Sequence, residues 1–288
     1  MTWITSLVLT LGALAVGVGG LVALGRARWN MVTQTLLGQL EATRRRPTTG
    51  RYDAAELEGL PAPVQRYFRA VLRDGQAIVM GANMRHTGTF NLSALGNRDW
   101  WIPFSSKQQV LTNRPGFVWS ARMALAPGIA VLVHDAYASG AGTLHPSILG
   151  LFSLATQHGS GEIARGELMR YMVEAAWYPT ALLPSQGTEW VAIDDASAAA
   201  TMVDGGISMS MRFTFDAGGL IESVRADARG ALICGKLVMM PWEGSLSNYQ
   251  ERAGMLVPLT GEAAWLTPGG RKPYWRGVIV ATTYEFAG

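Results

Sequence analysis

The sequence predicts an α+β fold: an N-terminal transmembrane helix followed by a large curved antiparallel sheet, or half-barrel, packed on helices. Three patterns point to this fold class. Residues 3–24 form an uncharged, mostly apolar run, residues 64–72 repeat apolar side chains with a helical period, and residues 207–215 alternate apolar and polar side chains. In the 288 residues we expect a transmembrane anchor at 1–28, a juxtamembrane helix and linker at 29–56, and a single β-rich globular domain at 57–288.

The apolar run at residues 3–24 is long enough to cross a bilayer. A helix of this length spans roughly 30 Å, about the hydrocarbon thickness of a membrane. A cleaved signal peptide would need a positively charged start, a shorter apolar stretch and a small-residue cleavage site. Met1 and Thr2 carry no basic side chain, and the residues just before Arg26 make a poor cleavage site. We therefore expect an uncleaved, single-pass anchor.

Basic residues flank the anchor only on its C-terminal side, at Arg26, Arg28 and Arg44. Because Lys and Arg are preferentially retained in the cytoplasm, this asymmetry predicts a cytoplasmic globular domain. The single cysteine, Cys234, excludes an internal disulfide, which agrees with a reducing compartment.

The formal net charge of the chain is +3, and an arginine run stands at residues 44–46. This run is either a contact for anionic lipid headgroups or a solvated part of the linker. No basic stripe with interleaved aromatic residues follows it, so we do not expect a nucleic-acid partner.

Three helical regions are expected. Apolar side chains at helical spacing predict a helix over residues 29–43, continuous with the anchor. After a linker at 47–50, prolines near residue 61 suit the first turn of a second helix that carries the apolar face of 64–72. The third region runs over 147–176, with an interruption near 159–161.

Alternation of apolar and polar side chains predicts the strands. The clearest strand is 206–215, followed by a turn at 216–219 and an antiparallel return at 220–229. Many short strands joined by Gly, Pro and Asp turns are typical of a large antiparallel sheet. The other expected strands are 84–92, 107–111, 117–123, 129–137, 189–193, 198–203, 231–240, 255–257, 262–266 and 274–284.

Several segments carry a resemblance that covers nearly everything after the anchor: 60–67 (LPAPVQRY), 115–119 (PGFVW), 135–142 (DAYASGAG), 166–174 (GELMRYMVE), 177–184 (WYPTALLP), 241–242 (PW) and 262–265 (EAAW). In this order they resemble an uncharacterised bacterial membrane-anchored family, domain-of-unknown-function family 6544. That resemblance implies an architecture and no catalytic residue. A weaker likeness to the lipoprotein-carrier half-barrels implies a curved antiparallel sheet wrapped around a helix.

The residue types that carry catalysis or metals are not arranged for either. His134 and Asp135 are adjacent on an expected strand, which directs them to opposite faces. His86, His145 and His158 lack a metal-binding spacing, so we expect no metal and no cofactor. No Gly-x-Ser-x-Gly elbow surrounds Ser160. We assign no catalytic residue.

Arg170 and Glu174 lie one turn apart on the third helix. They form either an exposed pair worth a few tenths of a kcal/mol or a buried polar lock with a partner such as Asp194 or Asp195. We favour a structural lock over a ligand contact.

Trp and Tyr side chains are the best functional clue, because they bury large apolar areas, keep a polar handle and suit lipid-facing grooves. Most of them are expected in the core. The candidate ligand-binding residues are Trp119, Tyr137, Arg170, Glu174, Trp177, Tyr178, Trp190 and Trp242.

The sequence therefore favours a non-enzymatic, membrane-anchored protein that binds a lipid or other apolar ligand in a groove between sheet and helix. One alternative is an interaction or scaffold protein, with a membrane protein as its partner. A further alternative is a hydrolase that uses Glu174 or Asp194 with His134.

Overall fold

The computed structural model describes residues 3–46, 49–96, 98–233 and 236–288. The start of the chain at Met1 and Thr2, the first linker residues Pro47 and Thr48, and the cysteine at position 234 lie outside the described residues. The helices are α1 (Trp3–Glu41), α2 (Ala62–Val71) and α3 (Glu162–Glu174), with short 3₁₀ helices η1 (Ala54–Leu57), η2 (Ala175–Trp177), η3 (Pro179–Leu182) and η4 (Pro184–Gln186).

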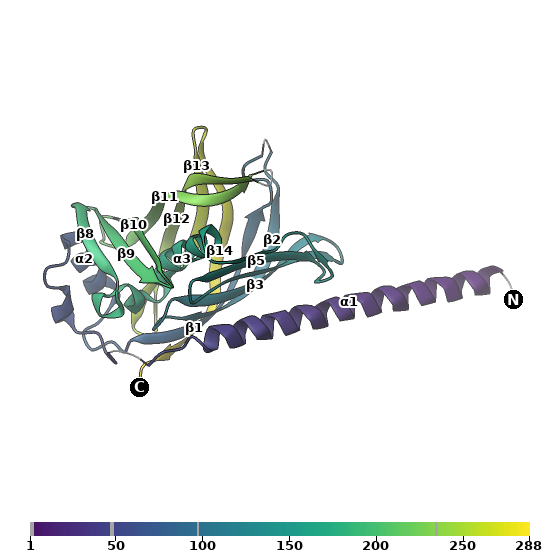
Figure 1. Cartoon of the computed structure of the whole chain (residues 1–288), viewed down its shortest axis with the longest axis horizontal. Helices are drawn as coiled ribbons and strands as arrows, with labels where there is room; N and C mark the ends of the chain where they lie inside the picture. Colours follow the sequence, from purple (N-terminus) through teal and green to yellow (C-terminus); the bar gives the residue numbers. More distant parts are fainter. Residues whose placement is uncertain (1–2, 47–48, 97, 234–235) are drawn as a thin grey trace.

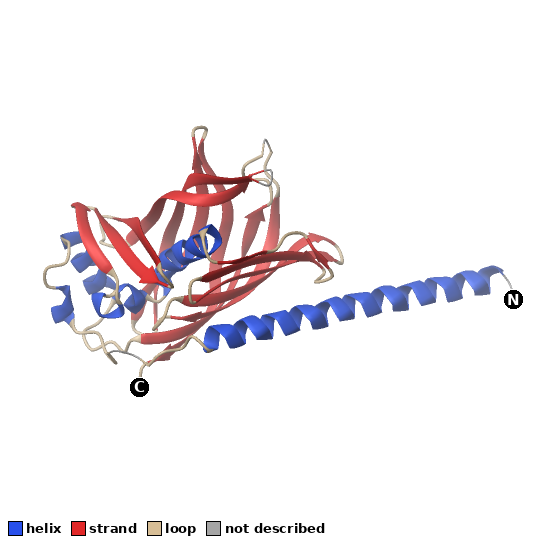
Figure 2. Cartoon of the chain, in the orientation of Figure 1, coloured by secondary structure: helices blue, strands red, loops and turns tan. Residues whose placement is uncertain are grey.

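The described strands form one large antiparallel sheet (Figures 1 and 2). Its strands are β1 (Val79–Asn91), β2 (Trp101–Leu111), β3 (Gly116–Ala126), β4 (Ile129–Ala138), β5 (Ala141–Ile148), β6 (Phe152–Ser153), β7 (Gln157–Gly159), β8 (Glu189–Asp194), β9 (Ser197–Asp204), β10 (Ile207–Phe215), β11 (Ile221–Ile233), β12 (Lys236–Arg252), β13 (Met255–Thr267) and β14 (Gly270–Phe286). The predicted fold class, a long apolar N-terminal helix followed by a large antiparallel sheet with a few helices, is confirmed.

The strand order is β6-β5-β4-β3-β2-β1-β14-β13-β12-β11-β10-β9-β8, with β7 pairing with β5. The first and last long strands, β1 and β14, therefore meet in the middle and join an N-terminal and a C-terminal half. The sheet curves so far that β4 and β9, from its two opposite halves, meet at one end of the molecule. There Tyr137 of β4 and Arg114 donate hydrogen bonds to Asp204 of β9, at 2.8 and 2.9 Å.

Helix α3 lies inside this curve (Figure 2), which explains why it is buried on nearly every side. Two glycines let the sheet approach it closely. A Cβ at Gly142 of β5 would lie 2.8 Å from the Ala164 backbone, and one at Gly244 of β12 would lie 2.5 Å from Val173. The main apolar core fills the space around α3 and extends under α2, where Val64, Tyr67 and Phe68 are buried. The helix predicted over 64–72 is thus confirmed, with its apolar face inward.

The second half of α1 packs on the outer face of the sheet. Trp29 stacks on His134 of β4, with ring centroids 3.7 Å apart, and Thr33 Oγ1 hydrogen-bonds His134 Nε2 at 2.7 Å. Further along, Leu40 packs with Leu111 and Val118. The helix predicted over 29–43 is confirmed as a direct continuation of the apolar N-terminal run.

Two buried histidines, His134 in this contact and His86 on the other face of the sheet, make the fold sensitive to acid. Burial and the nearby His145 lower the pKa of His134 to about 4, and burial lowers the pKa of His86 to about 3. Unfolded histidines titrate near pH 6.5, so the unfolded chain binds more protons than the folded chain below that pH. We expect full stability above pH 6.5 and a loss of up to about 1.4 kcal/mol per pH unit per histidine as the pH falls towards 4.

Unfolding free energies measured at pH 7 and pH 5 on the detergent-solubilised chain check this. His134→Gln should reduce the slope with pH, whatever it does to the stability at pH 7. A wild-type chain that is equally stable at both pH values would contradict the burial of neutral histidines.

The helix predicted for 147–160 was wrong. Residues 141–148 form β5 beside β4, short strands follow, and α3 begins only at Glu162. Apolar residues at 148, 151 and 154 imitate a helical period, but Leu149 and Gly150, at φ of 54° and 72°, turn the chain between β5 and β6 and interrupt any helix there. Gly159 and Gly161, at φ of 125° and 83°, then set the start of α3.

Several strand boundaries were also wrong, since β1 begins at Val79 and β2 at Trp101, earlier than the expected 84 and 107. Residues 231–233 still belong to β11, and the segments 255–257 and 262–266 form one continuous strand, β13. The predicted antiparallel pairing of 206–215 with 220–229 is confirmed as β10 with β11.

Candidate functional site

A cavity of about 100 Å³ lies on the concave face of the sheet, beside the C-terminal half of α3. Aromatic and charged side chains share its walls. Those that bear on function are Phe90, Trp119, Asp135, Arg170, Glu174, Trp177, Arg229, Trp242, Tyr274 and Trp275. They come from β1, β3, β4, α3, η2, β11, β12 and β14, so only the folded sheet brings them together.

The end of α3 places Trp177 in this wall. The helix continues into η2, and Pro179 follows two residues later, which prevents further α-helical bonding. The Trp177 ring lies against His86 and Trp275, with centroid distances of 5.2 and 6.5 Å. Its carbonyl accepts a hydrogen bond from Tyr284, whereas its indole Nε1 is buried without a partner among the described residues.

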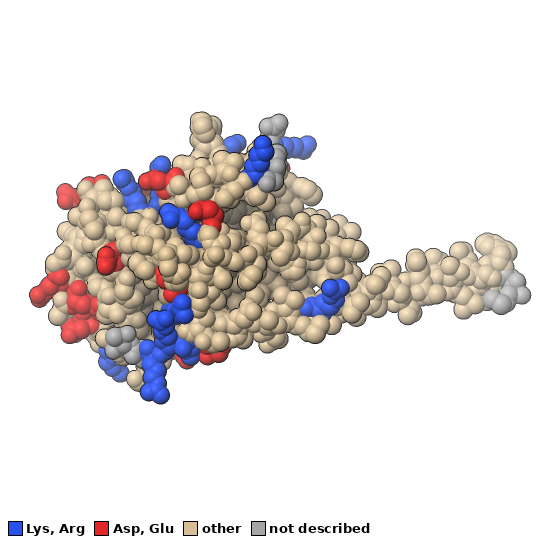
Figure 3. Space-filling view, viewed as in Figure 1, with Lys and Arg blue, Asp and Glu red and all other residues tan. Residues whose placement is uncertain are grey.

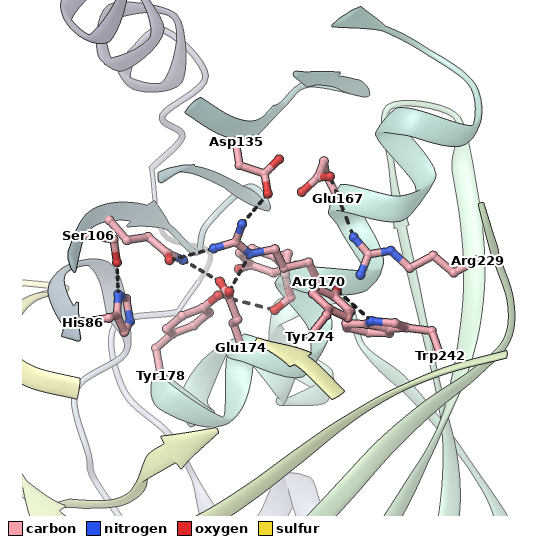
Figure 4. A network of polar contacts seen from close by, with 12 residues as sticks. His86, Ser106, Asp135, Glu167, Arg170, Glu174, Tyr178, Arg229, Trp242 and Tyr274 are labelled. Atoms are coloured by element: carbon pink, nitrogen blue, oxygen red, sulfur yellow. Dashed lines mark hydrogen bonds and ion pairs between the residues drawn. The ribbon is translucent and has the colours of Figure 1, made fainter. Parts of the chain in front are cut away.

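Arg170 forms the buried lock predicted from the sequence, but with other partners (Figure 4). Its guanidinium donates to Glu174 at 2.6 Å, to Asp135 at 2.5 Å and to Gln108 at 3.3 Å. It also lies 4.8 Å from the ring centres of both Phe117 and Trp119. Arg170 is thus fully engaged within the protein, which suits a structural role.

Asp194 and Asp195, the partners expected for this lock, are not part of it. Both lie at the exposed turn between β8 and β9, where Asp194 caps the amide of Ala196 at 2.9 Å. Strand β8 is the last strand of the sheet, whereas β4 with Asp135 passes directly beside α3. The expected pairing of Arg170 with Asp194 or Asp195 was therefore wrong, because the order of strands in the sheet decides which carboxylate lies beside α3.

Arg229 of β11 is a buried cation with incomplete pairing. It is 9 % exposed, its guanidinium lies 4.3 Å from the Trp242 ring, and Nη2 stands 3.8 Å from Glu167 Oε1. That separation is too long for a hydrogen bond. Arg229 Nη1 and Glu167 Oε2 have no hydrogen-bond partner among the described residues.

Glu167 compensates this cation poorly. Burial, followed by the neighbouring Asp135, raises the pKa of Glu167 well above its usual range. The raised pKa favours the uncharged form of Glu167, which weakens the compensation of the positive charge of Arg229 beside the cavity. The other carboxylates beside the cavity are already paired: Asp135 and Glu174 with Arg170, and Glu262 with Arg271 and Arg276.

Five of the eight residues predicted to bind a ligand line this cavity: Trp119, Arg170, Glu174, Trp177 and Trp242. The other three lie elsewhere. Tyr137 bonds Asp204, the Tyr178 hydroxyl is 3.4 Å from the Tyr171 carbonyl, and Trp190 packs against Phe213 while donating to the Leu182 carbonyl at 3.0 Å.

Sequence reasoning missed Arg229, and the reason is local. Strict alternation along β11 puts Arg225, Asp227 and Arg229 on one face. The register shifts by one residue between Ala226 and Arg229, because Ala226 pairs with Trp242 and Arg229 with Met240. Such a bulge redirects the following side chain, here into the cavity.

The histidines do not form a catalytic pair with the carboxylates considered above. His134 lies on the outer face of β4 against α1, Asp135 and Glu174 lie on the inner side, and Asp194 lies at the exposed turn. His86 is on the inner face, where its Nδ1 is 3.1 Å from Ser106 Oγ. Among the described residues, no three His, Cys, Asp or Glu side chains are placed to hold a metal ion.

A second hollow, of about 750 Å³, lies between α1 and the outer face of the sheet. Polar residues such as Asn83, Arg85, Lys107 and Arg122 share its walls with apolar residues such as Trp29, Leu37, Val118 and Leu132. It lies on the other side of the sheet from α3 and its aromatic residues, so we place the candidate site in the inner cavity.

Comparison with known proteins identifies the family. Residues 58–284 match the family of unknown function DUF6920. The chain belongs to this family. The number predicted from the sequence, 6544, was therefore wrong, whereas the expected status of an uncharacterised family was right. The matched segment contains α2, α3, every residue that lines the inner cavity and the described strands up to the last two residues of β14, and α1 precedes it.

Comparisons with curated proteins and with solved structures do not assign a function to the chain. No curated protein matches the chain. A solved structure described as the "LolA superfamily protein NE2245 from Nitrosomonas europaea" is 9 % identical, with a TM-score of 0.38, and the match covers 79 % of this chain and 94 % of that one. A likeness this distant gives no support to a shared function. The curved sheet around α3 agrees, independently, with the architecture implied by the half-barrel resemblance.

Proposed function

We propose that this DUF6920 protein is held in a membrane by α1 and binds one end of an amphipathic, lipid-like ligand with an anionic head in the cavity beside α3. The observation that carries the proposal is the presence of buried donors without partners in a cavity with aromatic walls. These donors are Arg229 Nη1, Trp119 Nε1 and Trp177 Nε1.

The walls favour an apolar ligand. Phe90, Trp119, Trp177, Trp242 and Trp275 offer flat apolar faces of the kind that line most ligand sites. The volume limits how much of a ligand can enter. A cavity of about 100 Å³ is well below the roughly 300–1,000 Å³ of sites that enclose a drug-sized molecule. Only the head and the first part of a chain fit inside.

The donors favour an anionic head. A buried polar group without a partner costs free energy, about 1–3 kcal/mol for a neutral donor and more for a charged one. A carboxylate or phosphate accepts from a guanidinium and from indole N–H groups at once, and charge-assisted hydrogen bonds are the stronger kind. Such a head, bound beside Arg229, would satisfy its unpaired Nη1.

Helix α1 supports the membrane part of the proposal. Its most apolar window of 18 residues has a mean hydropathy of 2.4 and is not buried by the rest of the protein. We propose residues 1–28 as the anchor, 29–56 as juxtamembrane helix and linker and 57–288 as the globular domain. The basic residues after the anchor favour a cytoplasmic domain.

Native mass spectrometry of the gently extracted full chain tests the proposal. We expect an adduct with the mass of an acidic lipid or fatty acid on the wild-type protein. Trp177→Ala removes one wall and one donor of the cavity and should greatly reduce the adduct. The matched control is Trp190→Phe, which changes a buried tryptophan outside the cavity and should keep the adduct. A wild-type protein without any adduct, or equal adducts on both variants, would contradict the proposed site.

A further inference from the structure

An exposed apolar tip stands at one end of the sheet. It consists of the turn between β3 and β4, with Ile129, and the turn and strand β5–β6 that follow, with Leu149, Leu151, Phe152 and Leu154. Three of these side chains are exposed: Ile129 at 45 %, Phe152 at 66 % and Leu154 at 55 %. Such a group of large exposed side chains is unfavourable in water and marks a contact surface.

The tip is also devoid of charge. From Met123 to Gly161 the sequence contains one Asp, Glu, Lys or Arg residue, Asp135, and that carboxylate is bonded to Arg170 inside the sheet. In Figure 3 the visible face beside α1 is accordingly almost free of charged atoms. An acidic or basic protein partner would find no counter-charge here.

The place of the tip relative to α1 indicates what covers it. The tip packs on α1 at Gly25, where a Cβ would lie 2.3 Å from the Leu149 carbonyl oxygen and 2.9 Å from Leu151. Gly25 directly follows the apolar run 3–24 and directly precedes Arg26 and Arg28. A helix rises 1.5 Å per residue, so the tip stands level with the boundary between the apolar and the basic part of α1.

The contact between α1 and the sheet is well fixed. The Trp29–His134 stack and the bond from Thr33 to His134 attach α1 to β4 within two turns of Gly25. The tip and the apolar half of α1 therefore keep their relative position.

We propose that the apolar tip inserts into the interfacial layer of the bilayer that holds α1, as a second membrane contact of the globular domain. The proposal rests on the proposed anchor. The bilayer is the occupant because the tip is uncharged, apolar and level with the end of the membrane-spanning run. Side chains such as Phe and Leu partition into this layer.

The second contact also orients the cavity. Phe90, near the end of β1, pairs with Ile102 at the start of β2. The start of β2 in turn pairs with the end of β3, which leads into the tip. The strand ends that carry the cavity and the tip therefore point the same way. Insertion of the tip would turn the end of the sheet with Phe90 towards the membrane, the source of an amphipathic ligand.

The test uses the full chain in liposomes of phosphatidylcholine and phosphatidylglycerol. Cys234→Ser provides a background for single labelling sites with an environment-sensitive fluorophore. The test site is Phe152→Cys, and the matched control is Val203→Cys, because Val203 is equally exposed at 64 % but lies on β9 near the turn that meets the opposite end of β4. Leu14→Cys, in the apolar half of α1, reports on the anchor itself.

We expect a blue-shifted emission from the fluorophore at residues 14 and 152. Lipids with a spin label near the headgroup should quench the fluorophore at residue 152, and lipids with a deeper spin label should quench the one at residue 14. Residue 203 should respond to aqueous iodide instead. Insertion of residue 14 with a water-exposed residue 152 would overturn the tip contact and leave the anchor intact. A water-exposed residue 14 would overturn both.

Discussion

Replacing Arg170 with methionine is expected to lower the free energy of unfolding by about 3–5 kcal/mol. Methionine fills a similar volume but leaves Asp135 and Glu174 without their cation, and their side chains are only 14 % and 9 % exposed. Removing one partner of a buried ionic network lowers stability strongly, because it leaves an uncompensated buried charge. Replacing the whole network by apolar residues of similar volume changes stability far less. Urea unfolding of the detergent-solubilised chain, followed by circular dichroism in the β-sheet region, gives the number.

Two further variants make this result specific. Arg73 pairs with Glu251 at 3.3 Å on the surface, with side chains 72 % and 64 % exposed, so Arg73→Met should change stability by no more than about 0.5 kcal/mol. Asp135→Asn combined with Arg170→Met removes one of the orphaned charges and should recover part of the loss. If Arg170→Met were as mild as Arg73→Met, Arg170 would not hold a buried network.

The elements that sequence reasoning predicted correctly are those with a strong local signal. Helix α2 has prolines at its start and a continuous apolar face, and β10 alternates strictly over its whole length. The segment around β5 has no such signal. Its residues can form an amphipathic helix as well as a strand, and pairing with β4 decides between them, which is a tertiary effect.

The candidate site divides in the same way. Trp119, Trp177 and Trp242 could be predicted because large aromatic residues are natural walls for an apolar ligand. The acidic partner of Arg170 could not be predicted, because the choice between Asp135 and Asp194 depends on the order of strands in the sheet. The position of Arg229 in the cavity could not be predicted either, because one bulge in β11 changes the face of the sheet to which the Arg229 side chain points.

Arg229 is expected to dominate the affinity for an anionic ligand. Its Nη1 is the one guanidinium nitrogen of this cavity that is buried without a partner among the described residues. A hydrogen bond to a charged group contributes about 1.5–3 kcal/mol, so its loss in Arg229→Met should weaken binding by roughly 10- to 100-fold. Methionine keeps an apolar contact with Trp242, and the raised pKa of Glu167, caused first by burial, favours the uncharged form of this carboxyl once the cation is removed.

Arg229→Lys is the matched control. Lysine keeps the positive charge but loses the planar fork and its stacking on Trp242, so an intermediate affinity is expected. A neutral ligand with the same chain should bind all three proteins almost equally, because it makes no charge-assisted hydrogen bond with residue 229.

The most direct test of the proposed site is quenching of tryptophan fluorescence by a fatty acid brominated on the chain carbons close to its carboxyl group, titrated against the matching brominated alcohol. The aromatic cavity walls make tryptophan the natural reporter. We predict that the wild-type protein binds the acid more tightly than the alcohol, and that Arg229→Met loses this preference and keeps the weaker binding. Equal affinities of acid and alcohol for the wild-type protein, or an unchanged preference in Arg229→Met, would contradict an anionic-head site at Arg229.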